Sequence, residues 1–151
     1  MRYVLRWTAG ALLALILFAT PAGAQVSPDG DEAVRRVLDA YIKLYTRDTL
    51  AEWRTLFLPS FSAAFTNADG SITVRNLDEF YERQRGFFAT GRRISEELQN
   101  VQIARQHRIA SVRADFVLFE DDMARPGRLM MLLIEDRGVF KIQALVFTYH
   151  I

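Results

Sequence analysis

The sequence contains no cysteine, and only two of its 151 residues are histidine. The absence of cysteine excludes disulfide bonds, a thiol nucleophile and a thiolate metal site. His107 and His150 have no metal-ligand spacing to each other or to nearby acids, so no metal site is predicted. There is also no glycine-rich phosphate loop, nucleophile elbow or paired-carboxylate spacing, and we predict no cofactor.

The first 24 residues have the composition of a cleaved secretory signal peptide. Arg2 and Arg6 precede the apolar run 11–18, which is too short to span a bilayer. Ala22-Gly23-Ala24 then forms a small-x-small cleavage site ahead of Gln25. We therefore predict a bacterial protein exported to the periplasm or secreted, with no stable membrane anchor after cleavage. An uncleaved N-terminal anchor is the alternative.

Charge excludes one class of partner. Removing residues 1–24 removes two of the 19 basic residues and no acid, so 17 basic residues face 18 acidic ones. This balance gives no electrostatic support for binding a nucleic acid. The remaining chain is long enough for one domain with a hydrophobic core. We predict a flexible lead-in over residues 25–30 and a single domain over residues 31–151.

Helical patterns fill the first part of this domain. After a cap at Asp31, apolar residues recur every three or four positions as far as Tyr45, which predicts a long amphipathic helix. Thr49 and Glu52 form a T-x-x-E capping box for a short second helix. We expect Pro59 to end that helix.

A hairpin and a third helix follow. Residues 61–75 contain two short strand patterns around turn residues 67–70. Asn76 and Glu79 repeat the capping pattern, and the helix that they begin should stop near Gly91.

The last third of the chain predicts an antiparallel meander. Four long strands are expected over residues 94–104, 109–119, 129–134 and 139–150, with polar turns between them. The fold class predicted is α+β, with a curved, mostly antiparallel sheet and the three helices of the N-terminal half packed on its concave face.

The outer face of this sheet is unusually apolar for a sheet with helices on one side. In the last strand, side chains alternate between the two faces, so Phe140 and every second residue after it up to Val146 are assigned to the inner face. The outer face then includes Val117, Phe119, Leu145, Phe147 and Tyr149. We predict that these five residues form a homodimer interface. The alternative is that the sheet curls and covers this face itself.

The order and lengths of these elements resemble the nuclear transport factor 2-like superfamily, a cone-shaped α+β barrel with SnoaL-like and ketosteroid-isomerase-like members. The residues that carry the resemblance are Ala40–Tyr45, Ala51–Phe57, Phe80-Tyr81 and Phe140–Ile142. The resemblance covers essentially all of the chain after residue 24, and it implies a pocket between the helices and the sheet.

The resemblance does not extend to the chemistry of ketosteroid isomerase. Tyr41 falls where that enzyme places its hydrogen-bonding tyrosine. The strand after the second helix, residues 61–66, has no acid in the place of the catalytic base. The position of the second acid falls near Met131 or Leu132, which are apolar. Two of the three catalytic groups are missing, so this reaction is excluded.

We predict that Tyr41, Tyr45, Trp53, Tyr81 and His150 line the pocket. Because the inner face of the sheet is apolar and few ionisable groups converge on it, the first hypothesis is a non-catalytic module, with this pocket taking a small hydrophobic ligand or with a surface for protein interaction. The second is an isomerase, cyclase or dehydratase that acts on a small hydrophobic substrate and uses Tyr41 or Tyr45 together with His150, which could serve as general base. The third is a subunit without a pocket, filled by large side chains: Trp53, Phe87 and Phe88.

Overall fold

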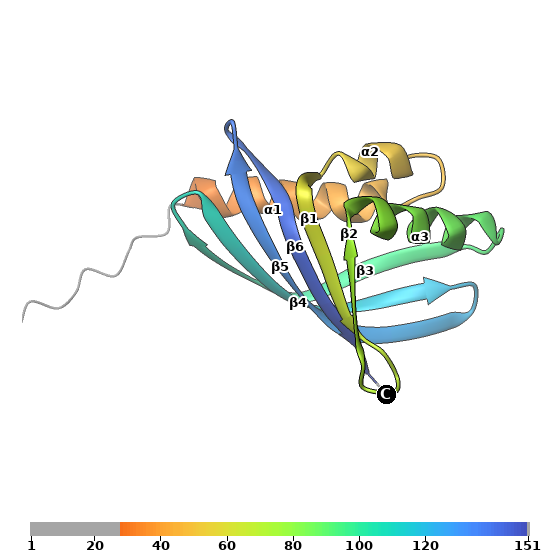
Figure 1. The fold of residues 1–151 in the computed structure, drawn as a ribbon. Coiled ribbons are helices and arrows are strands. Elements are labelled where there is room, and N and C mark those ends of the chain that lie inside the picture. Colours follow the sequence, from red (N-terminus) through yellow and green to blue (C-terminus); the bar gives the residue numbers. More distant parts are fainter. Residues whose placement is uncertain (1–27, 151) are drawn as a thin grey trace, which may run out of the picture.

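The computed structural model describes residues 28–150 (Figure 1). The predicted signal peptide, residues 1–24, lies outside the described residues, as do residues 25–27 of the predicted lead-in.

Three helices and six strands make up the described chain (Figure 1). The helices are α1 (Pro28–Leu44), α2 (Leu50–Arg54) and α3 (Leu77–Ala89). The strands are β1 (Phe57–Thr66), β2 (Ile72–Asn76), β3 (Ile94–Gln106), β4 (Ile109–Glu120), β5 (Met123–Asp136) and β6 (Val139–Tyr149).

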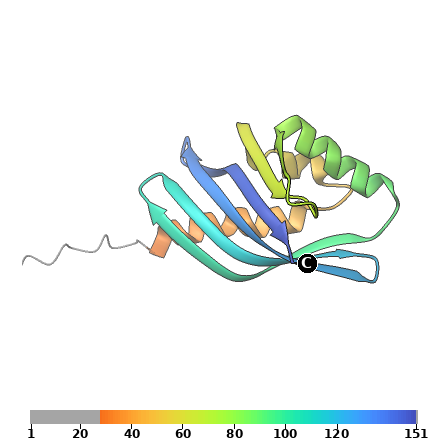
Figure 2. The same cartoon turned by 60° about the horizontal axis from the view of Figure 1, so that its bottom comes forward.

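The strands form one sheet in the order β2-β1-β6-β5-β4-β3. The β1–β6 pair is parallel and the other neighbouring pairs are antiparallel. The sheet is strongly curved but open, and the three helices lie across its concave side (Figures 1 and 2). The predicted α+β architecture is confirmed.

The first helices differ from the prediction at their ends. α1 begins at Pro28, before the expected cap at Asp31, and proline is well tolerated at a first helical position. The Thr49–Glu52 capping box does not form, because the Thr49 hydroxyl donates to the Leu44 carbonyl oxygen at 2.9 Å. By contrast, the capping box that we predicted for α3, Asn76 with Glu79, is present.

Two strands begin earlier than predicted. β1 starts at Phe57 and includes Pro59, so Pro59 does not end a helix. β5 starts at Met123, well before the strand that we predicted over residues 129–134. Gly127 is needed within β5, because a Cβ atom there would collide with the ring of Phe116.

A bulge changes the faces of β6. Ile142 pairs with Leu133 and Ala144 pairs with Leu132, which leaves Gln143 as an extra residue. Before the bulge, Phe140 and Ile142 are buried; after it, Leu145 is buried and Val146 is exposed. The predicted faces of the second half of the strand were therefore reversed.

The centre of the core is an aromatic cluster around the fully buried Trp53 of α2. Its indole lies 4.6 Å from the ring of Phe57 and 5.4 Å from the ring of Tyr41, between centroids. Phe80 of α3 lies 5.8 Å from it on another side. Aromatic pairs at these separations stabilise the packing beyond their buried area, so the cluster joins all three helices to β1.

The convex face of the sheet exposes a row of apolar side chains. The strand register places Val74, Ala64, Val146 and Met130 side by side across four strands. Leu132 follows two residues along β5 and is also exposed. The homodimer expected from the sequence stays a proposal, and after the β6 bulge is taken into account this row is the surface that would carry it.

A single charge on this row tests the proposal. We predict that Val146→Lys gives a monomer in native mass spectrometry under conditions in which the unsubstituted chain is a dimer, because an ammonium group cannot be buried without a partner. Val139→Lys is the control, since Val139 is similarly exposed (55% against 52%) but lies at the β5–β6 turn. A Val146→Lys chain with unchanged mass would contradict the proposal.

Candidate functional site

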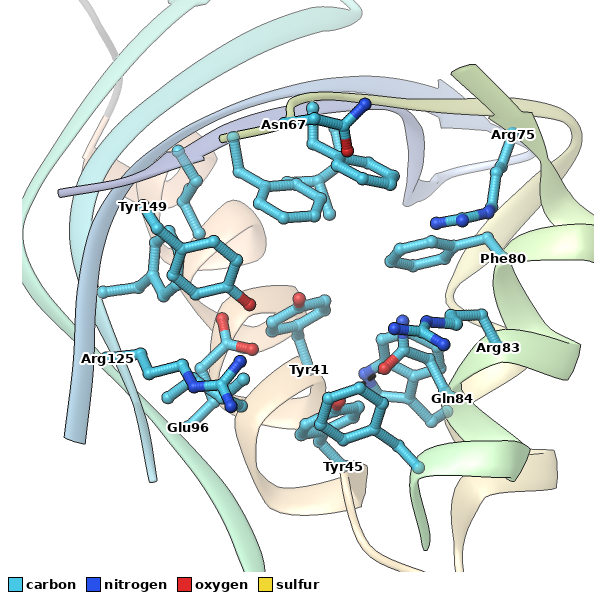
Figure 3. A pocket seen from close by; sticks show the side chains of 18 residues that line it. Tyr41, Tyr45, Asn67, Arg75, Phe80, Arg83, Gln84, Glu96, Arg125 and Tyr149 are labelled. Atoms are coloured by element: carbon cyan, nitrogen blue, oxygen red, sulfur yellow. Dashed lines mark hydrogen bonds between the residues drawn. The ribbon is translucent and has the colours of Figure 1, made fainter. Parts of the chain in front are cut away.

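A cavity of about 250 Å³ lies between the helices and the concave face of the sheet (Figure 3). Its walls are mainly aromatic: Tyr41, Tyr45, Trp53, Phe65, Phe80, Phe87, Phe116, Phe147 and Tyr149. Six polar or charged side chains interrupt this surface: Asn67, Arg75, Arg83, Gln84, Glu96 and Arg125. The third sequence hypothesis, a subunit without a pocket, does not describe this structure.

Three of the five predicted pocket residues line the cavity, and two do not. Tyr41, Tyr45 and Trp53 contribute to its wall. Tyr81 instead packs under the guanidinium group of Arg54, 5.0 Å from the ring centroid. His150 is exposed and outside the cavity, because the bulge in β6 reverses the phase on which its placement depended.

The same bulge corrects the predicted dimer interface. Leu145, Phe147 and Tyr149 line the cavity and are not on the convex face, so their assignment to the interface was wrong. Val117 and Phe119 alternate with the buried residues of β4 and do lie on its other face, half-buried.

The one acidic side chain in the cavity wall is Glu96 of β3. It alternates with Ile94 and Leu98, which pack against the core, and therefore points to the concave side. Its carboxyl group accepts a hydrogen bond from the Tyr41 hydroxyl. Burial away from water raises the pKa of Glu96 to about 8, and the hydrogen bond from Tyr41 only partly offsets this.

Two tyrosines accompany this acid. Figure 3 shows the hydroxyl groups of Tyr41 and Tyr149 directed toward the Glu96 carboxyl group, from α1 and β6 respectively. Burial raises the pKa of both phenols, and the nearby Glu96 carboxylate raises them further. Both therefore stay protonated and can donate hydrogen bonds at neutral pH.

The cations of the wall have different surroundings. Arg125 forms an ion pair with Glu120 at 2.9 Å, and Glu120 is buried and also paired with Arg92. Arg75 lies over the ring of Phe65, while Arg83 lies over the ring of Phe87.

The remaining polar contacts orient the wall. The Tyr45 hydroxyl donates to Gln84 Oε1 at 2.6 Å, which ties α1 to α3 across one end of the cavity. The Trp53 indole N–H is buried and has no acceptor among the described residues. An unsatisfied buried donor is costly, about 1–3 kcal/mol, so this group favours a ligand or water that can accept from it.

Sequence reasoning missed Glu96, the three arginines and Gln84. The signal for Glu96 was present, since Ile94, Glu96 and Leu98 alternate as a strand face does. We found no comparable signal for Arg75 and Arg83, because each lies on a different element and looks like an ordinary surface cation.

Residues 28–150 contain no group of three or more histidine and acidic side chains placed to hold a metal ion. Within the same range, every helix is too short or too polar to cross a bilayer.

Residues 34–149 match the SnoaL-like domain family, and the chain therefore belongs to that family. A comparison with curated proteins finds no match.

Solved structures with the same fold are known. One is a candidate scytalone dehydratase of Novosphingobium aromaticivorans, with a TM-score of 0.69, 15% identity, and coverage of 82% of this chain and 85% of that one. Another is the β subunit of a candidate aromatic-ring-hydroxylating dioxygenase of the same organism, with a TM-score of 0.67, 14% identity, and coverage of 82% and 90%. A third is a nuclear transport factor 2-like protein of unknown function from Silicibacter pomeroyi, with a TM-score of 0.64, 13% identity, and coverage of 81% and 97%. At these identities the likeness shows the fold alone.

The raised pKa of Glu96 predicts how stability depends on pH. Between the ordinary pKa of a glutamate and about 8, the folded chain holds a proton that the unfolded chain has released. The free energy of unfolding should therefore fall as pH rises through this range and level off above 8, with a slope of at most about 1.4 kcal/mol per pH unit.

Urea denaturation at pH 5, 6, 7, 8 and 9 measures this effect. We expect Glu96→Gln to remove most of the slope between pH 5 and 8. Glu97→Gln is the control, because Glu97 is exposed on the opposite face of the same strand. Equal slopes for the unsubstituted chain and the Glu96→Gln variant would contradict the assigned pKa.

Proposed function

We propose that the chain is an enzyme that transfers protons on a small, largely apolar substrate, of the isomerase, cyclase or dehydratase type. The observation that carries the proposal is the placement of Glu96, a carboxyl group with a strongly raised pKa in an aromatic cavity. Perturbed acids in such pockets are typical of general acid–base catalysis.

Glu96, Tyr41 and Tyr149 would have different roles in this reaction. A carboxyl group with a pKa near 8 can donate a proton to a carbonyl or departing hydroxyl oxygen and take one back from carbon. Tyr41 donates to Glu96, which limits the orientations of the carboxyl group. The phenol of Tyr149 points to the same place and could donate to a developing oxyanion (Figure 3).

The sequence favoured a non-catalytic module because few ionisable groups were expected to converge on the pocket. Glu96 removes that reason. Among structures of similar fold, one is named as a candidate scytalone dehydratase, which makes dehydration a reaction of interest. No ketosteroid-isomerase chemistry is implied, because β1 has no acid in the corresponding place and Met131 is apolar.

A generic proton-abstraction probe tests the role of Glu96. We expect the chain to accelerate the elimination of 5-nitrobenzisoxazole, a planar aromatic compound whose reaction needs only a base. The rate should rise with pH and level off above about 8, as Glu96 loses its proton. Glu96→Gln should lower kcat/KM by about 100-fold or more, in keeping with the usual contribution of a positioned base.

Two controls make the result specific. Glu97→Gln should leave the rate unchanged, since that side chain faces away from the cavity. Tyr41→Phe should move the midpoint of the pH–rate profile to higher pH, because the hydrogen bond from Tyr41 stabilises the Glu96 carboxylate and lowers its pKa. If Glu96→Gln reacts as fast as the unsubstituted chain, Glu96 is not the proton-transfer group and the binding hypothesis is preferred.

We further propose that the protein acts outside the cytoplasm. The support is the sequence pattern of residues 1–24, with basic residues, an apolar run and the Ala22-Gly23-Ala24 site. When the full-length chain is produced in a Gram-negative host, mass spectrometry of the periplasmic fraction should find a polypeptide that begins at Gln25. A full-length chain confined to the cytoplasm would contradict export, and Ala24→Arg should block cleavage.

A further inference from the structure

Two arginines of the cavity wall have no acidic partner among the described residues. Arg75 comes from β2 and Arg83 from α3, and Figure 3 shows both guanidinium groups on the side of the pocket opposite Glu96 and Tyr149. None of the ion pairs among the described residues includes either one. Each guanidinium group instead lies over an aromatic ring, that of Phe65 for Arg75 at 4.7 Å and that of Phe87 for Arg83 at 5.2 Å from the ring centroid.

Stacking leaves the hydrogen-bonding edges of these groups free. A guanidinium group that lies over a ring presents its N–H donors in the plane of the group, outward from the ring. Such a group is held in place but is not neutralised. Two of them, from different elements on one side of the same cavity, form an arrangement suited to a group with several acceptor oxygens.

The charges of the cavity do not cancel. Arg125 shares the Glu120 carboxylate with Arg92, whereas Arg75 and Arg83 have no carboxylate partner among the described residues and contribute two uncompensated positive charges. The one acid of the wall, Glu96, holds its proton at neutral pH and offers little compensation. Around an otherwise aromatic surface, this favours a ligand that brings negative charge.

The neutral polar groups of the cavity wall also favour a ligand that accepts hydrogen bonds. The Trp53 N–H is a buried donor without an acceptor among the described residues, and the phenol of Tyr149 remains a donor, whereas the Tyr41 hydroxyl already donates to Glu96. The Tyr45 hydroxyl is already used by Gln84. The cavity therefore offers many donors and few free acceptors.

We propose that the pocket takes an anionic aromatic or alicyclic compound whose carboxylate, phosphate or sulfate group is bound by Arg75 and Arg83. Its apolar body lies among the rings, and its other end reaches Glu96. That last placement rests on the proposed proton-transfer function, whereas the recognition of the anion does not. Ionic binding at one end and chemistry at the other would fix which atom of the ligand meets the acid.

A matched pair of probes tests the proposal by isothermal titration calorimetry. Naphthalene-2-carboxylate carries the anion, and naphthalene-2-methanol is its neutral counterpart of nearly the same shape. We expect the carboxylate to bind at least about tenfold more tightly at low salt, with the preference shrinking as salt rises. Arg75→Gln and Arg83→Gln should each reduce binding of the carboxylate about tenfold and leave binding of the alcohol unchanged.

Matched variants separate this effect from damage to the fold. Arg85→Gln is the control, because Arg85 is on the same helix as Arg83 but pairs with Glu82 outside the cavity. Arg83→Lys keeps the charge without the planar fork and should retain part of the preference. Binding of the alcohol by each variant shows that the pocket is intact.

The outcomes are distinguishable. Equal affinity for the two probes, binding of neither probe, or a preference that survives the Arg75→Gln/Arg83→Gln double variant would each overturn the proposal. Glu96→Gln should bind the carboxylate normally. If the chain prefers the anionic probe but does not transfer protons, only the proposed reaction is contradicted. If it transfers protons but does not prefer the anionic probe, only the anion site is contradicted.

Discussion

The pocket depends on one irregularity in the sheet, the bulge at Gln143. The side-chain amide of Gln143 forms two hydrogen bonds with β1: its Nε2 donates to the Ser60 carbonyl oxygen at 2.8 Å, and its Oε1 accepts from the Ser60 hydroxyl at 2.8 Å. The β1–β6 register shifts at the same place, where Pro59 lacks an N–H to donate. Because the side-chain period of a strand is two, one extra residue turns Leu145, Phe147 and Tyr149 from the convex face into the cavity.

The proposed chemistry depends on Glu96, a residue that the fold does not need. A carboxyl group beside an aromatic core costs free energy whenever it is ionised, and a single hydrogen bond from Tyr41 does not offset this. An apolar residue at position 96 would pack as well as its neighbours Ile94 and Leu98 do. Such a local conflict between sequence and burial is expected at functional sites, where the group is retained for what it does.

Much of the fold could be predicted from local patterns, and the failures have physical causes. The α3 capping box and the four long strands were confirmed because each depends on residues close in sequence. The Thr49 cap failed because its hydroxyl found the Leu44 carbonyl, and Pro59 was misassigned because an irregular strand accommodates it. The faces of β6 depend on the bulge at Gln143, whose side chain is hydrogen-bonded to Ser60, far away in sequence. The positions of Arg75 and Arg83 in the cavity wall likewise depend on how β2 and α3 pack against each other, which local sequence patterns do not predict.

The central claim is that Glu96 keeps its proton at neutral pH inside the cavity. The most direct measurement is a titration of the Glu96 side-chain carboxyl carbon by ¹³C NMR, with Glu96→Gln used to assign the signal. A midpoint near pH 8, shifted upward in Tyr41→Phe, is the predicted result. A midpoint near the ordinary value for glutamate, about 4.3, would contradict the account and leave the pocket without a proton-transfer group.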